Sequence, residues 1–411
     1  MLPLLPAARA ADAPERARAV VTVEAGDLDR SNTVVGFDLP DALLQSEGLA
    51  LRDSGGRKLP VQRDGKRAYF VLPSLARARR ATYQLVAAEA AGAAVVEVKQ
   101  EESSLVATAG GRQVFQFRTR APAPTAEVPA EYTRAGYLHP VLTPRGLVIT
   151  DDSPADHRHH HGIWTAWTSV DYQGRHLSFW GPTPGKSKND LVAVSDLWSG
   201  PLAGGFSAKL ASTDLTTTPG RQLIDSEWKV VVYAPPAGKS APPPYFVFDL
   251  QWTDRVVGDK PVQLPEYRYG GLGVRGQREW LEPGKVTCLT SEGKDRLAGE
   301  NTRVRWVHLG GPVGGVGSKV KGTAGLAILV HPSNLRAPEP VRLNPGIPEL
   351  CLSPVKAGPL TLEPGHPYVA QYRFVVADGP ANAALLERLW RDYARAPVVK
   401  VALPGGGGNR S

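Results

Sequence analysis

The sequence predicts an all-β protein with one helix near its C-terminal end. Gly (43) and Pro (37) are abundant among the 411 residues, which favours many turns over long helices. Short runs rich in β-branched and aromatic residues recur along the chain and are divided by Gly, Asp and Pro. Apolar residues make up 42% of the chain and charged residues 21%, so the composition is that of a globular protein rather than a disordered one.

The first predicted element is a small β domain. Its strand-like runs recur about every ten residues over 19–88, a spacing typical of an immunoglobulin-like sandwich. These runs are VVTVEA, TVVGFDLP, LALRD, KLPVQRD, AYFVLP and TYQLVA. Alternating runs (VVEVKQ and VFQFRTR) continue the pattern up to the linker-like APAPTAEVPA at 121–130. We expect the immunoglobulin-like domain to cover 19–122, with its core at 19–88, and a larger domain to cover 123–400.

Strands dominate the larger domain as well. The clearest run is YFVFDLQWTD at 245–254, and WKVVVY, GLAILVHP and YVAQYRFVV are three more. A helix is expected at 381–394, because the leucines and aromatics of ANAALLERLWRDYA share one face at helical spacing. Pro380 stands near the start of this helix, where proline is tolerated. Residues 401–411 are expected to form a flexible tail.

The N-terminal residues predict a location. A short apolar stretch leads to the small residues Ala8-Arg9-Ala10, which resemble a cleavage site. We therefore expect 1–18 to be a signal-like or disordered segment and the protein to be periplasmic or secreted; the alternative is a disordered cytoplasmic tail. No run of 18 apolar residues occurs, so no transmembrane helix is expected.

Charge and cysteine content exclude further classes. The net charge is +8, but acidic residues are interspersed and no basic block occurs, so nucleic-acid binding is not expected. Cys288 and Cys351 are far apart in sequence, and no CxxC motif exists, which excludes a thiolate zinc site. The two cysteines either form one disulfide or stay reduced.

The strongest chemical signal is a histidine cluster. Five of the nine histidines fall within 23 residues, and they are His139, His157, His159, His160 and His161. In extended backbone His157, His159 and His161 would point one way, and Asp156 and His160 the other. Three imidazoles on one face suit a divalent ion such as Zn, Fe, Mn, Ni or Cu, and a neighbouring carboxylate orients such ligands. We expect His157, His159, His160 and His161 to bind a divalent metal ion, with Asp156 behind them; the alternative is histidines hydrogen-bonded in a polar core.

Other residues are candidates for substrate binding and proton transfer. Tryptophans beside polar groups suit the C–H faces of sugar rings, although tryptophans also fill cores. We expect substrate contacts from His139, Trp164, Trp167, Trp180 and Tyr269. In the segment EYRYGGLGVRG, Glu266 could act as a general base or metal ligand, and Arg268 or Arg275 could hold an anionic or keto oxygen. The alternative for this segment is a bulged strand with surface ion pairs.

A third polar group follows the strand-like run LAILV. His331, Asn334 and Arg336 lie in a loop at the end of this run, where binding residues are common, although a simple turn explains them equally well. The sequence contains no GxSxG elbow, HExxH helix, phosphate loop or dinucleotide-binding glycine pattern.

Three segments together resemble a known family. They are YLHPVLTPRGLVITDDSPADHRHHHGIWTAW, EYRYGGLGVRG and LVHPSNLRAP. They resemble bacterial proteins catalogued as PmoA-like, or as a domain of unknown function, over roughly 130–395. Its members read DHxHH, then Arg or His, then Gly, so Asp156, His157, His159 and His160 match, whereas His161 stands at a variable place. The resemblance implies a large two-sheet β-supersandwich, like that of galactose mutarotases, preceded by an immunoglobulin-like domain.

These observations lead to one functional hypothesis and two alternatives. The hypothesis is a secreted or periplasmic carbohydrate-active enzyme in which a divalent metal polarises a sugar oxygen. His160 or Glu266 would move a proton, giving elimination, hydration or hydrolysis, and we expect Glu266 to share one concave site with the histidines. The alternatives are a metal-dependent oxygenase, as the family label suggests, and a non-catalytic glycan-binding protein.

Overall fold

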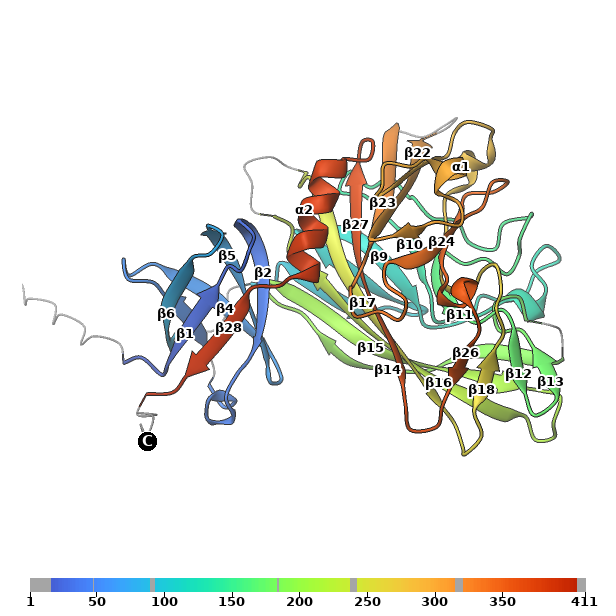
Figure 1. The fold of residues 1–411 in the computed structure, drawn as a ribbon, viewed down its shortest axis with the longest axis horizontal. Coiled ribbons are helices and arrows are strands. Elements are labelled where there is room, and N and C mark those ends of the chain that lie inside the picture. Colours follow the sequence, from blue (N-terminus) through green and yellow to red (C-terminus); the bar gives the residue numbers. More distant parts are fainter. Residues whose placement is uncertain are drawn as a thin grey trace, which may run out of the picture. The chain divides into compact units, whose positions relative to one another are not determined.

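The computed structural model describes residues 16–46, 48–88, 93–182, 185–236, 242–314 and 321–404. The chain forms two compact units: Met1–Gly92 with Pro397–Ser411, and Ala93–Ala396 (Figure 1). The predicted all-β fold, a small sandwich ahead of a large two-sheet sandwich, is confirmed. The signal-like segment lies almost entirely outside the described residues, so the periplasmic or secreted location stays a prediction.

The small unit is a sandwich of seven strands in the order β2-β5-β4-β3-β6-β1-β28. The strands are β1 (Ala19–Glu24), β2 (Arg30–Asp38), β3 (Leu49–Arg52), β4 (Lys58–Asp64), β5 (Arg67–Leu75), β6 (Arg80–Ala87) and β28 (Val398–Ala402). Strand β4 pairs with β3 through its first half and with β5 through its second, which folds the sheet over an apolar core. The core includes the fully buried Leu51, Phe70 and Leu85.

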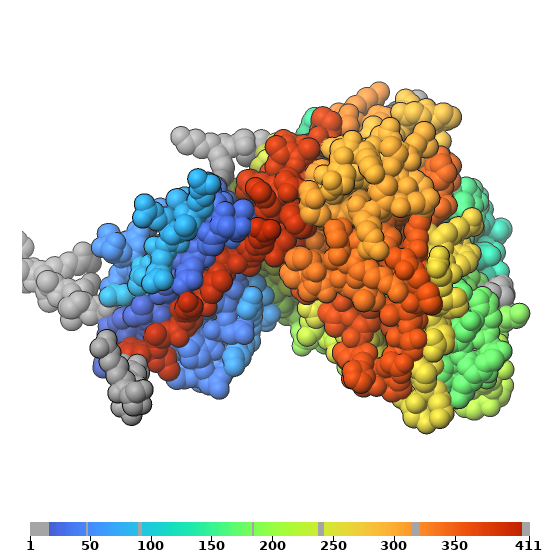
Figure 2. Space-filling model, viewed as in Figure 1, coloured from blue at the N-terminus to red at the C-terminus, as the bar shows by residue number. Residues whose placement is uncertain are grey.

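The last strand of the chain returns to the small unit. Strand β28 pairs antiparallel with β1, with Val20 opposite Ala402 (Figures 1 and 2). Val401 and Ala402, which we expected in a flexible tail, therefore belong to a sheet, and 405–411 lie outside the described residues. The run VVKVA is short and rich in valine, which indicates a strand but does not indicate the strand with which it pairs.

The large unit is built from two long sheets and a small one. The 9-stranded sheet runs β21-β24-β25-β19-β11-β10-β9-β8-β7, the 8-stranded sheet β14-β15-β16-β17-β27-β23-β22-β20, and the 4-stranded sheet β13-β12-β18-β26. The 9-stranded sheet contains β7 (Val96–Gln100), β8 (Ser104–Ala109), β9 (Arg112–Arg118), β10 (Leu138–Val141), β11 (Ile163–Ala166), β19 (Gly271–Arg275), β21 (Arg303–Val304), β24 (Glu339–Leu343) and β25 (Glu349–Leu352). The 8-stranded sheet contains β14 (Ser187–Trp198), β15 (Ala203–Asp214), β16 (Arg221–Tyr233), β17 (Tyr245–Val256), β20 (Thr287–Thr290), β22 (Trp306–Val313), β23 (Gly322–Val330) and β27 (Tyr368–Asp378). The small sheet contains β12 (Val170–Tyr172), β13 (Arg175–Leu177), β18 (Val262–Leu264) and β26 (Leu360–Leu362).

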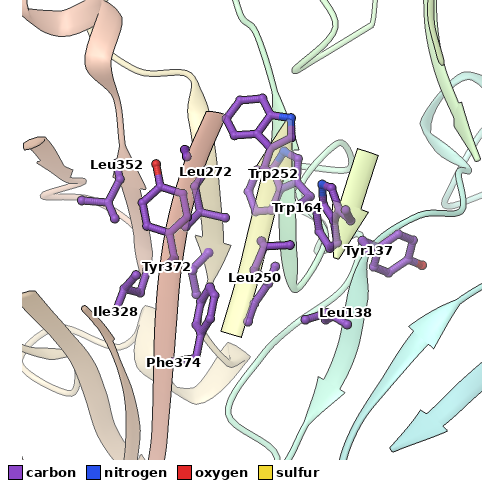
Figure 3. Packing of buried hydrophobic residues seen from close by; sticks show 14 of the residues in the cluster. Tyr137, Leu138, Trp164, Leu250, Trp252, Leu272, Ile328, Leu352, Tyr372 and Phe374 are labelled. Atoms are coloured by element: carbon purple, nitrogen blue, oxygen red, sulfur yellow. The ribbon is translucent and has the colours of Figure 1, made fainter. Parts of the chain in front are cut away.

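Side chains of the two long sheets interdigitate in one apolar core. Phe115 of β9 and Phe248 of β17 meet edge to face, with their centroids 5.0 Å apart. Figure 3 shows residues of β17 and β27 among residues of β19 and β25, so the core is continuous across the sandwich. Tyrosines and tryptophans add polar atoms to this core. Trp167, Trp228 and Tyr372 have buried hydrogen-bond partners, whereas the indole N–H groups of Trp164 and Trp180 and the Tyr172 hydroxyl have none among the described residues.

Strands β7–β9 show where the two units divide. We expected 19–122 to form one domain, but β7, β8 and β9 pair with each other and then with β10 in the 9-stranded sheet. The division therefore falls near residue 93. Alternation of apolar residues marks these segments as strands but does not say which sheet they join.

The helix near the C-terminus is confirmed as α2 (Ala383–Ala394). The side chain of Asn382 accepts a hydrogen bond from the backbone N–H of Leu385 and caps its first turn. Leu386 and Leu389 pack on β22 and β23. A one-turn helix α1 (Arg296–Gly299) and 3-10 turns at Asp41–Leu43, Ala130–Tyr132, Arg278–Leu281 and Pro354–Ala357 complete the described helical structure.

Two carboxyl groups lie inside the large sandwich. Glu339 accepts hydrogen bonds from the Asn334 amide (2.7 Å) and the Tyr372 hydroxyl (3.1 Å), and Asp254 accepts from Trp167, Trp252 and Ser226. Burial raises the pKa of Glu339 to about 7 and that of Asp254 to about 6 against the opposing effect of these donors. Each group therefore favours the folded state at acidic pH, and that contribution is lost as pH rises through its folded pKa.

We predict that Glu339→Gln flattens the pH dependence of stability. The glutamine keeps an acceptor for Asn334 and has no charge to bury at neutral pH. Urea unfolding at about pH 5 and about pH 8 should show that the wild type loses about 3 kcal/mol more than the variant between the two conditions. Equal losses in both proteins would contradict a Glu339 pKa raised by burial.

Candidate functional site

The candidate site lies on the face of the 9-stranded sheet that is turned away from the 8-stranded sheet. Thr165 of β11 marks the inner face, because it accepts a hydrogen bond from Trp228 of β16 at 2.9 Å. Neighbouring positions alternate between the faces, so Trp164 lies on the outer face, in register with Gly273. The strand pairs continue this outer face through Cys351 and Arg342, and through Arg275 opposite Glu349. Two arginines and a glutamate are thus placed on one layer by strand pairing alone.

A glycine makes room for two tryptophans on this layer. A side chain at Gly273 would place its Cβ 2.5 Å from Trp180 and 2.9 Å from Trp164. The two indoles lie with their centroids 4.6 Å apart over the glycine. We expected both tryptophans to contact a substrate. Trp164 is fully buried by this packing and lines no described cavity, whereas Trp180 lines one.

The histidine segment is a pair of turns and not the extended strand that we expected. The backbone N–H of His157 donates to Pro154, and that of His160 donates to His157. The rings of His157, His159 and His160 therefore gather, with centroids 4.6–5.7 Å apart. We refer to 153–162 as the histidine loop.

His161 points away from the other three histidines. Its Nδ1 lies 2.8 Å from Asp152, which also accepts a hydrogen bond from the Tyr137 hydroxyl at 2.8 Å. The expected side-chain alternation along a strand is therefore wrong, because turns replace the extended backbone. His139, an expected substrate contact, pairs with Thr150 at 2.9 Å beside this group.

An ion pair ties the histidine loop to the sheet. Arg275 of β19 donates from Nη2 to both oxygens of Asp156 at 2.8 Å, and Asp156 also lies 3.0 Å from Nδ1 of His157. Burial opposes ionisation of Asp156, but the hydrogen bonds from Arg275 and His157 outweigh it and lower the pKa. Nε and Nη1 of Arg275 are buried without a hydrogen-bond partner among the described residues. Arg275 thus lies beside the histidine loop, and Asp156 links it to His157.

His160 is buried against Trp164 and Glu349. Its ring centroid lies 5.2 Å from that of Trp164, and its Nε2 lies 3.5 Å from a Glu349 oxygen. Burial, followed by the neighbouring imidazoles, lowers the pKa of His160 well below its ordinary value and that of His159 to about 4. Both rings are therefore neutral at neutral pH.

Glu349 and Arg342 are functional candidates that sequence reasoning missed. Glu349 accepts a hydrogen bond from Asn344 at 2.8 Å, and Arg342 lies 4.0 Å from it. Each is a charged residue next to apolar residues of a short strand, Arg342 in β24 and Glu349 in β25. A charged residue in such a run was the only sign in the sequence that could have indicated a functional role. Only the pairing of β24 with β25 brings these residues beside the histidine loop.

His159 faces a cavity of about 520 Å³, which we call the His159 cavity. Its walls combine aromatic rings, hydroxyl groups and cationic side chains. They are formed by Tyr132, His159, Thr168, Ser169, His176, Leu177, Ser178, Trp180, Gly181, Pro182, Lys186, Tyr267 and Tyr269. Burial, followed by a hydrogen bond with Tyr267, raises the pKa of Tyr269 to about 12, so this phenol keeps its proton.

Glu266 and Arg268 lie in a neighbouring depression, contrary to the single site that we expected. This basic depression, about 620 Å³, is lined by Glu266, Tyr267, Arg268, Asn301, Arg303, Pro340, Lys356 and Ala357. Tyr267 lines both spaces, whereas Glu266 lines only the basic depression. The described lining of the His159 cavity includes Tyr267 and Tyr269 of the EYRY segment but not Glu266 or Arg268.

The remaining predicted contacts have structural roles elsewhere. Asn334 holds the buried Glu339, and Arg336 donates to the carbonyls of Pro354 and Gly358. His331 pairs with Ser333 at 2.7 Å and contacts Tyr393 of α2. Trp167 donates to Asp254 inside the sandwich at 2.7 Å. The polar loop after LAILV is therefore a turn whose side chains satisfy backbone and core groups.

The metal site expected at the histidines stays a prediction. His157 stacks on His160 with an interplanar angle of 25°. Asp156 and Asp152 contact only Nδ1 of His157 and of His161, which leaves Nε2 of both rings available to another partner. Within the described ranges, no three His, Cys, Asp or Glu side chains are arranged to hold a metal ion.

Two further sequence expectations concern cysteines and membranes. Cys288 and Cys351 are both free thiols, on strands of different sheets. Among the described residues, no helix has the length and apolar character needed to cross a membrane.

Solved structures with a similar arrangement are distant. One is a protein in the glycosyl hydrolase family 38 from Enterococcus faecalis, with 8% identity and a TM-score of 0.40, covering 95% of this chain and 48% of that one. Another is an alpha-mannosidase from Enterococcus faecalis V583, with 9% identity and a TM-score of 0.36, covering 95% and 46%. This chain spans about half the length of both. No curated protein matches it.

The family model corrects the resemblance drawn from the sequence. The match covers residues 104–391, including the histidine loop and the basic depression, and it is to a family of unknown function. The PmoA-like assignment is wrong, because nothing in the match points to that family. The chain belongs to the family of unknown function DUF6807.

Proposed function

We propose that this protein is an enzyme that transforms a carbohydrate by proton transfer, with His159 as the general base. The observation that carries the proposal is a neutral imidazole facing a cavity walled by aromatic rings and hydroxyl groups. A volume of about 520 Å³ suits a small-molecule ligand. Aromatic faces pack on the C–H faces of sugar rings, while Thr, Ser and Lys side chains bond sugar hydroxyls.

His160, Glu349 and Asp156 act as positioning residues in this proposal. His160 meets His159 edge-on, with centroids 4.6 Å apart, and lies 3.5 Å from Glu349 on its other side. Asp156 fixes the loop to Arg275. His159 is thereby held against the sheet, and no metal ion takes part in the proposed step.

The Tyr269 phenol is the proposed acid. It lines the same cavity as His159, and its pKa of about 12 keeps it protonated at neutral pH. A neutral base and a protonated acid at one cavity are the pair that elimination, hydration or hydrolysis requires.

We predict that His159→Ala lowers kcat by about 10²–10⁴-fold, because it removes the base. The assay is release of products from a panel of neutral and acidic polysaccharides, followed by mass spectrometry. The dissociation constant of the best substrate should stay within about threefold, since the aromatic walls remain. His331→Ala, which changes a histidine beside α2, is the matched control and should behave as wild type.

Two outcomes would overturn the enzyme proposal. Full turnover by the His159→Ala protein would remove His159 from the chemistry. Wild-type protein that binds glycans tightly but converts none of them would support the non-catalytic glycan-binding alternative.

We predict that kcat/KM rises with pH through about pH 4 and stays high to neutral pH. The base must be unprotonated, and burial lowers the pKa of His159 to about 4. A rise centred near the ordinary histidine pKa would show that the working base is another histidine or that His159 is solvated in the free enzyme.

We predict that prolonged dialysis against a chelator leaves turnover unchanged. The proposed step uses only side chains of this chain. Loss of turnover that one divalent ion restores would reinstate the metal-dependent hypothesis, and elemental analysis of protein purified without a histidine tag would then identify the ion.

A further inference from the structure

The surroundings of the His159 cavity are rich in cations. Lys186 lines the cavity, and no Asp or Glu is among its described lining residues. Behind the cavity wall, the guanidinium groups of Arg268 and Arg342 lie 5.3 and 5.6 Å from the ring centroid of Tyr269. Positive charge is therefore gathered around the proposed acid and beside the proposed base.

One of these cations has an unused donor. Nε of Arg342 is buried and has no hydrogen-bond partner among the described residues, the Glu349 carboxylate being 4.0 Å away. Arg275, on the same layer, leaves two such nitrogens. Glu300 lies 3.4 Å from Nη1 of Arg342 and 3.2 Å from Lys356, so one carboxylate serves both cations. The buried nitrogens of Arg342 and Arg275 line neither space, and they contribute positive charge behind the wall of the His159 cavity.

The basic depression is also lined by more cationic than anionic side chains. Arg268, Arg303 and Lys356 line it against a single carboxylate, Glu266. Because Tyr267 lines both spaces, the depression adjoins the His159 cavity. A chain of sugar units could occupy both, with one unit at His159 and its neighbour at the arginines.

We infer that the substrate is a glycan of uronate units and that the reaction is β-elimination. This inference rests on the proposed function and names its substrate class. Carboxylates of the sugar units would pair with Lys186 in the His159 cavity and with Arg268 and Arg303 in the basic depression. A cation at the carboxylate also makes the proton on the adjacent carbon, C5, easier to remove.

The elimination balances with the groups present. His159 takes the C5 proton, and the electron pair of the C5–H bond forms the C4=C5 double bond. The C4–O4 bond breaks, and O4 leaves with its electron pair and takes the Tyr269 hydroxyl proton. Solvent returns the proton from His159 to Tyr269. One glycosidic bond is broken, one double bond is formed, and neither water nor an oxidant is consumed.

The test is an assay of the full chain on polymers of galacturonate, of mannuronate and guluronate, and of glucuronate-containing glycans. Elimination gives a product with a C4=C5 double bond conjugated to the carboxylate, which absorbs in the ultraviolet, together with new reducing ends. We expect such a product from at least one polyuronate. Methyl esterification of that substrate removes its charge and should lower kcat/KM by at least about tenfold.

A charge variant tests the basic depression separately. Arg303→Gln should raise KM for the acidic oligosaccharide about tenfold with kcat within about threefold, because Arg303 lines the basic depression and not the His159 cavity. Added salt should narrow the difference in KM between the variant and the wild type. Arg255→Gln is the matched control, because Arg255 forms an exposed ion pair with Glu227 on the 8-stranded sheet and should leave KM unchanged.

The outcomes separate this inference from the proposed function. Reducing ends without ultraviolet absorbance indicate hydrolysis, and turnover of neutral glycans alone indicates an uncharged substrate. Either result overturns the inference and leaves His159-dependent carbohydrate chemistry intact. Absence of turnover on every acidic and neutral glycan overturns both.

Discussion

The ion pair between the buried Arg275 and the more exposed Asp156 is the contact on which the site depends. Arg275 is fully buried on the outer layer of the 9-stranded sheet, and Asp156 is the acceptor that the described structure provides for it. Removal of Asp156 would leave the guanidinium charge of Arg275 buried without this partner. This contact therefore fixes the histidine loop to the sheet. The turns between Asp156 and His160 then bring the imidazoles of His157, His159 and His160 together.

The sandwich gives this layer its chemistry by dividing the two faces of the sheet. Inward positions of β19, β24 and β25 pack into the apolar core, so outward positions are where charged residues are tolerated. On this face, Trp180 packs against Trp164 over Gly273 beside the charged residues. The result is a polar, largely buried layer in which electrostatic interactions and hydrogen bonds are stronger than in water. His159 lies where this layer borders the His159 cavity.

The sequence predicted much more of the fold than of the site. Alternation identified strands such as β17, and helical spacing identified α2, because both patterns are local. The partners of β7–β9 and β28 depend on pairing between distant segments, which alternation does not encode. The same limit explains the site: Arg275 and Asp156 were recognised singly, whereas Glu349 and Arg342 acquire meaning only through the register of β19, β25 and β24. The prediction that Glu266 shares one site with the histidines was wrong, because Glu266 lines the basic depression and His159 lines the neighbouring cavity.

The spacing of the histidines did not determine how their rings are arranged. The turns at Pro154 and His157 stack the imidazoles of His157 and His160, and His159 lines the cavity. Stacking and burial disfavour the charged form of each ring, and each neighbouring imidazole lowers the pKa further. The cluster thus keeps His159 unprotonated at the edge of a cationic cavity. An unprotonated base beside positive charge is suited to removing a proton from carbon next to a carboxylate, because the same cations that hold the substrate stabilise the negative charge that develops on it.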